Sequence, residues 1–125
     1  MDWNDFDYGQ YDVMADMLMD KYPDIDGIFA ADMVAIACIR QLLKRKKKVP
    51  RDVKVVAYDG TYVAKVGVMN LTVVQQPIEE LAKSAVNILL NMMQGKKYHN
   101  KKAFFEPSLL YGDTTYNKDK IEFEN

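Results

Sequence analysis

The sequence is poor in the residues that cross-link small proteins or bind metals, with one cysteine, Cys38, and one histidine, His99. A single cysteine excludes an internal disulfide and favours a reducing compartment such as the cytoplasm. His99 lacks metal-ligand spacing to Cys38, and one loop histidine supports no Ser-His-Asp arrangement. There is also no glycine-rich phosphate loop. We therefore expect no metal, no cofactor and no catalytic residue.

Long apolar runs are missing as well. No stretch reaches the roughly 18 apolar residues that a membrane-spanning helix needs. The first ten residues, MDWNDFDYGQ, are acidic and aromatic, whereas a signal peptide begins basic and continues apolar. At 125 residues the chain has the length of one domain with a real core. These observations indicate a cytoplasmic protein with no membrane partner.

Prolines and glycines are few, and they mark the ends of the elements. A helical apolar pattern ends at Pro23, and its members are Tyr11, Met14, Ala15, Leu18 and Tyr22. The run 26–31 is typical of a buried strand. Asp32 follows it at an N-cap position for a helix over 32–43. Cys38 lies in the middle of that helix, where a small core residue is expected.

The second half of the chain repeats the alternation of strand and helix. Residues 52–58 and 71–74 are predicted strands, joined by a weakly helical link over 61–68. Pro77 opens a strongly amphipathic helix that Gly95 closes. Its apolar face comprises Ile78, Leu81, Ala82, Ala85, Ile88, Leu89 and Met92. A last extended segment covers 103–111. This order predicts an α/β fold with a largely parallel sheet and helices on both faces.

Charge is distributed unevenly along the chain. Residues 1–32 contain nine Asp against one Lys, a balance of −8, so the remaining residues sum to +7 within a net charge of −1. The positive charge is densest at 44–48, directly after the predicted helix 32–43. Nucleic-acid binding is one interpretation. Because no aromatic residue is interleaved for stacking, we favour a solvated helix end, where cations suit the carbonyl groups.

Polar side chains stand where the predicted strands end. Asp32 follows the first strand, Asp59 ends the second, and Gln76 follows the third. In open α/β sheets ligands bind at the carboxyl ends of the strands. A cleft that presents carboxylate and amide groups without a cation suits a neutral, hydroxyl-rich ligand. We therefore expect these residues to form a binding site. For Asp59 alone, the competing interpretation is an ordinary turn residue before Gly60.

An enzymatic interpretation of VVAYDGT (55–61) fails at one position. The stretch is similar to the second half of the haloacid-dehalogenase phosphatase motif, in which an apolar strand ends Asp-x-Asp-Gly-Thr. Asp59, Gly60 and Thr61 match, but Ala57 stands where the nucleophilic Asp is needed. A methyl group cannot attack phosphorus. We expect the protein not to be an enzyme.

Three segments, in order, resemble the lactose-repressor/galactose-repressor (LacI/GalR) family of bacterial transcription regulators. They are FAADMVA (29–35), VPRDV (49–53) with its strand ending in Tyr58 and Asp59, and LTVVQQP (71–77). The resemblance covers about residues 8–115. It implies one subdomain of a periplasmic-binding-protein-like type I fold. Residues 1–115 would be the C-terminal effector-binding subdomain of a longer protein, and 116–125 a polar tail.

The resemblance also implies site residues and partners. Asp59 and Gln76 match positions that contact a sugar-like effector, and Asp32 matches an acid at the start of its helix. The ring that stacks on the ligand is Trp3 or, as a second choice, Phe6. Operator DNA would be bound only by a headpiece outside this chain. A homodimer is implied, with the helix 32–43 near the contact.

A sugar-binding subdomain of a secreted solute-binding protein is the alternative interpretation. It would share the fold and the cleft. The VPRDV and QQP segments favour the repressor family.

Overall fold

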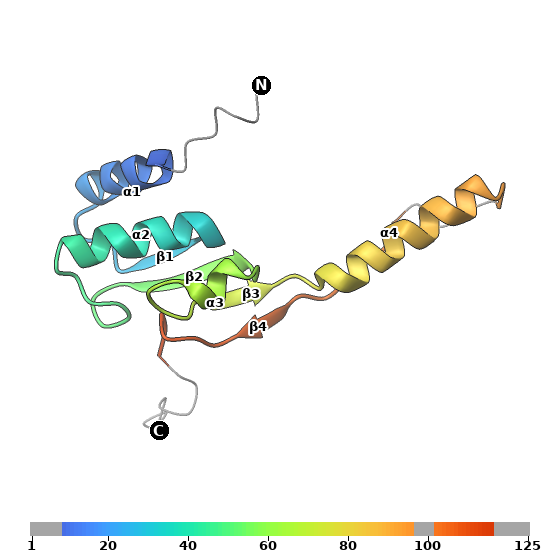
Figure 1. Cartoon of the computed structure of the whole chain (residues 1–125). Helices are drawn as coiled ribbons and strands as arrows, with labels where there is room; N and C mark the ends of the chain where they lie inside the picture. Colours follow the sequence, from blue (N-terminus) through green and yellow to red (C-terminus); the bar gives the residue numbers. More distant parts are fainter. Residues whose placement is uncertain (1–8, 97–101, 117–125) are drawn as a thin grey trace.

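The computed structural model describes residues 9–96 and 102–116. Its elements are α1 (Gly9–Lys21), β1 (Gly27–Ala31), α2 (Asp32–Lys44), β2 (Lys54–Asp59), α3 (Val63–Val66), β3 (Thr72–Gln75), α4 (Ile78–Met93) and β4 (Ser108–Leu110). The sheet has the order β1-β2-β3-β4. The first three strands are parallel and β4 is antiparallel to β3 (Figure 1). The predicted α/β fold with a largely parallel sheet is therefore confirmed.

The core lies between the sheet and α2. Alternate residues of β2, Val55 and Ala57, are fully buried beneath the helix. The helix contributes the face formed by Ala35, Cys38, Ile39 and Leu42. This pattern follows from geometry, because residues two apart on a strand and three or four apart on a helix share a face. Cys38 is a buried core residue, as predicted, and burial raises the pKa of its thiol.

Helix α1 packs against α2, and in Figure 1 it lies on the side of α2 away from β2 and β3. The residues it buries are Ala15 and Met19. The sequence predicted Met14 and Tyr22 on the inner face, and this was wrong, because they are 61% and 50% exposed. Tyr11 and Leu18, also on the predicted face, are partly buried against the core, so the buried face is the predicted one shifted toward Met19.

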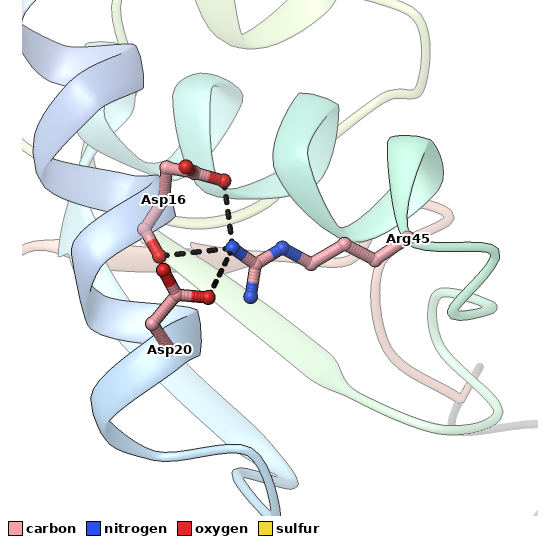
Figure 2. Close-up of polar contacts among 3 residues, drawn as sticks. All are labelled: Asp16, Asp20 and Arg45. Carbon is pink, nitrogen blue, oxygen red and sulfur yellow. Dashed lines mark hydrogen bonds and ion pairs between the residues drawn. The ribbon is translucent and has the colours of Figure 1, made fainter.

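The acidic start and the basic run meet between these two helices. Arg45, just after α2, donates from one guanidinium nitrogen to Asp16 Oδ1 and Asp20 Oδ1, both at 2.7 Å, and to the Asp16 carbonyl at 3.1 Å (Figure 2). Hydrogen bonding to Asp16 raises the pKa of Arg45 further. Arg40, within α2, donates from Nε and Nη2 to Asp12 Oδ1 at 3.1 and 3.0 Å. The charge asymmetry of the sequence therefore joins α1 to the body of the fold.

The face of the sheet opposite α2 is largely open among the described residues. Phe29, Tyr58 and Leu109 lie on it with 66%, 38% and 50% of their surfaces exposed. The rings of Phe29 and Tyr58 meet edge to face, with centroids 6.1 Å apart. We expected helices on both faces. In the described part of the chain, the helix that packs against the strands is α2, on one face.

Helix α4 runs out from the end of β3 and away from the sheet (Figure 1). Its predicted start after Pro77 and its end near Gly95, which has φ 70°, are confirmed. The predicted apolar face exists, but none of the helix residues is buried. Leu89 and Met92, for example, are 58% and 61% exposed. Within the described ranges, no helix is long and apolar enough to cross a membrane.

Candidate functional site

The carboxyl ends of β2 and β3 bring Asp59 and Gln76 together. The parallel register places Asp59 opposite Gln75, the last residue of β3. The backbone N–H of Gln76 donates to the Asp59 carbonyl at 3.0 Å. Its side-chain amide donates to Asp59 Oδ1 at 2.6 Å. The predicted convergence of these two residues is therefore what the structure shows.

Asp59 has an unusual backbone. Its φ is 110°, in a region that residues with a side chain rarely occupy, and Gly60 follows at φ 72°. Such conformations cost of order 1–3 kcal/mol and cluster at ligand-binding sites. The backbone conformation of Asp59 is therefore imposed by the residues that contact it, and it sets the direction of the side chain.

The pair retains hydrogen-bonding capacity toward a ligand. Among the described residues, Asp59 Oδ2 and the carbonyl oxygen of the Gln76 side chain have no hydrogen-bond partner. Both residues are partly exposed, so these oxygens face accessible space. A carboxylate and an amide carbonyl side by side accept hydrogen bonds from vicinal hydroxyl or amine groups. Acceptors of this kind can recognise a ligand that carries hydroxyl or amine groups.

Asp32 reaches the same edge of the sheet, but its oxygens are already engaged. The N–H groups of Gly60 and Thr61 donate to Oδ1 and Oδ2 at 3.4 and 2.7 Å, and the Thr61 hydroxyl donates to Oδ2 at 2.7 Å. The sequence predicted Asp32 as the N-cap of α2. This was wrong, because Ala31 is the N-cap and Asp32 is the first residue of the helix.

Among the described residues, no further expected site residue joins the edge of the sheet that carries Asp59 and Gln76. Trp3 and Phe6 lie outside the described residues. A depression of about 420 Å³ opens between α3 and β4, lined among others by Ala64, Asn70 and Tyr111, and it includes no residue of the Asp59 edge. The described ranges hold no group of three His, Cys, Asp or Glu side chains placed to bind a metal.

Sequence reasoning missed how the turn after β2 is built. Gly60 lies against β3, where a Cβ would be 2.6 Å from Gln75 Cγ and 2.8 Å from Gln75 Cα. The Gln75 side chain also donates to the Gly60 carbonyl at 3.3 Å. On the other side of the turn, the Thr61 hydroxyl donates a hydrogen bond to Asp32 Oδ2. The only sequence signal for this arrangement was the Asp-Gly-Thr stretch itself.

Comparison with known proteins identifies the family of the chain. A family described as the periplasmic binding protein-like domain matches residues 3–115. The chain is 31% identical, over 86% of its length, to the HTH-type transcriptional regulator CelR of Thermobifida fusca. It is 28% identical, over 94%, to the ribose operon repressor of Halalkalibacterium halodurans. It spans about a third of either relative, 32% and 36% respectively.

Solved structures agree. The CelR–cellobiose complex superposes with a TM-score of 0.79 at 30% identity, covering 88% of this chain and 34% of that one. A LacI-type regulator from Bifidobacterium animalis subsp. lactis gives 0.81 at 25% identity, covering 88% and 40%. The chain therefore belongs to the periplasmic binding protein-like domain family, in the form found in LacI-type transcriptional regulators.

Proposed function

We propose that this chain is the C-terminal part of the effector-binding module of a LacI-type repressor, and that it binds a sugar with Asp59 and Gln76. The observation that carries the site is the 2.6 Å bond between Gln76 Nε2 and Asp59 Oδ1. It holds one carboxylate oxygen and leaves Oδ2 without a partner among the described residues. The similarity to a cellobiose-binding regulator supports the ligand class.

The rest of the proposal concerns the whole protein. Operator DNA is bound by a separate helix-turn-helix headpiece, and the protein acts in the cytoplasm as a homodimer without enzymatic activity. Trp3, or alternatively Phe6, stacks on the sugar ring. The regulators among the relatives support this assignment over a secreted solute-binding protein. The upstream coding sequence distinguishes the two, because a helix-turn-helix indicates regulation and a signal peptide indicates transport.

A thermal-shift screen of the full-length protein tests sugar binding. Cellobiose, lactose, ribose and their phosphates form the panel. A sugar at about 100 times its Kd adds roughly 2.7 kcal/mol of stability and raises Tm. Asp59→Ala should weaken binding about ten- to a hundredfold, because it leaves a ligand hydroxyl unpaired.

Asp113→Ala is the matched control. It removes a carboxylate that accepts two hydrogen bonds from Asn70, away from the Asp59 edge. This variant should keep the sugar affinity of the wild type. A sugar that stabilises wild type and Asp59→Ala equally would show that Asp59 is only a turn residue.

A further inference from the structure

The Asp32 carboxylate is the most deeply buried acid at the sheet edge. Asp32 is only 2% exposed, and its two oxygens accept three hydrogen bonds, all from Gly60 and Thr61. A buried carboxylate is stable when its oxygens are satisfied in this way. The start of α2 adds a favourable helix dipole. Oδ1 accepts only the 3.4 Å bond from Gly60, but at 2% exposure the residue presents almost no surface to a ligand.

Asp32 binds the turn formed by residues 59–61, and this turn sets the orientation of the Asp59 side chain. Residues 59 and 60 both have positive φ, at 110° and 72°. Gln75 closes the turn from β3 through the Gly60 carbonyl, and Asp32 closes it from α2 through Gly60 and Thr61. The strained backbone of Asp59 is therefore fixed from two elements that are far apart in sequence.

We propose that Asp32 and Thr61 are positioning residues: they bind no effector themselves but hold Asp59 in the orientation that binds it. This inference rests on the proposed role of Asp59. It assigns Asp32 a different part from the effector contact that the family resemblance implies. Asn cannot replace Asp32 fully, since one of its ends is an NH₂ group and would meet an N–H of the turn.

A double-mutant cycle on the full-length protein separates positioning from contact. Calorimetric titration with cellobiose and lactose gives the affinity. Asp32→Ala should weaken binding about tenfold in the wild-type background and have no further effect in Asp59→Ala, because its action passes through Asp59. An equal loss in both backgrounds would mean that Asp32 contacts the sugar directly, and would overturn the proposal.

Thr61 offers a milder test if Asp32→Ala does not fold. Thr61→Val removes the hydroxyl donor at constant shape and should weaken binding several-fold, whereas Thr61→Ser should restore it. Equal affinity of Thr61→Val and wild type contradicts the proposal.

A ligand-free measurement keeps the inference independent of the sugar. With ¹⁵N-glutamine labelling, the Gln76 side-chain amide reports its bond to Asp59. Its signal should move to the free-amide position in Asp32→Ala and Thr61→Val, although neither residue touches Gln76, and stay in place in Asp113→Ala. An unmoved signal overturns the positioning role. If neither sugar binds wild type, the choice of sugar fails while this measurement still decides the role of Asp32.

Discussion

The hydroxyl of Thr114 donates to the carbonyl of Val55 at 2.6 Å, and the Val55 N–H returns a bond to the Thr114 carbonyl at 3.0 Å. The same hydroxyl oxygen accepts the N–H of Thr72 at 2.9 Å. Thr114 is fully buried. One side chain near the end of the described chain therefore joins the starts of β2 and β3, which carry Asp59 and Gln76 at their other ends.

We expect Thr114→Val to destabilise the fold. The substitution removes the hydroxyl that hydrogen-bonds the Val55 carbonyl and the Thr72 N–H. Leaving these buried groups unpaired should lower the free energy of unfolding by about 1–3 kcal/mol. Urea denaturation followed by circular dichroism measures the loss. Thr114→Ser keeps the hydroxyl and should lose less. Equal stability of the two variants would show that the hydroxyl contributes little.

Substitutions at Asp59 should separate stability from binding. The φ of 110° at this position is unstrained for glycine but strained for alanine. Asp59→Gly should therefore be more stable than Asp59→Ala by about 1 kcal/mol, although both lose the carboxylate and should bind sugar equally poorly. Thermal melts without ligand measure the difference. An alanine variant as stable as the glycine variant would argue against a strained backbone.

Gly60→Ala should be more costly than the same change at Gly95 or Gly27. A Cβ at Gly60 meets Gln75 at 2.6–2.8 Å and also sits at φ +72°, whereas Gly95 shares the positive φ with open space around it. Gly27 has neither constraint. The losses should rank Gly60 above Gly95 above Gly27, with about 1 kcal/mol for the positive φ alone. Denaturation midpoints of the three variants test this order.

Asp52 should make stability depend on acid pH. Arg51, at 2.8 Å, and the backbone N–H of Lys48, at 2.7 Å, hold the pKa of this carboxyl below its ordinary value. Its contribution is thus present above the unfolded-state pKa of about 3.9 and lost as pH falls through the lower folded pKa. Asp52→Asn should be less stable at pH 7, and the gap should close toward pH 3. Urea midpoints across that range measure it; a constant gap would contradict the assignment.

Much of the fold was predictable because buried strands and amphipathic helices leave strong periodic signals. The strands around Val55 and Val73 and the helix containing Cys38 were located within one or two residues. The meeting of Asp59 and Gln76 followed from topology, since adjacent parallel strands end at the same edge.

What the sequence did not reveal depends on contacts between distant segments. An Asp that caps its own helix and an Asp that holds a turn 28 residues away look alike in sequence, so the part played by Asp32 was hidden. Thr114 lies in a polar stretch without periodicity. For α4, amphipathicity predicts an apolar face but not whether another segment covers it.

The burial of Cys38 has a practical consequence for labelling. It is the only cysteine among the 125 residues, it is 1% exposed, and burial raises the pKa of its thiol. Its thiolate, the form that reacts with maleimides, is therefore scarce and shielded at neutral pH. Tyr62 is 78% exposed and lies three residues beyond Asp59. A cysteine introduced there would react with a maleimide fluorophore far faster than Cys38. Within these 125 residues, the sequence therefore allows one fluorophore to be attached selectively near Asp59.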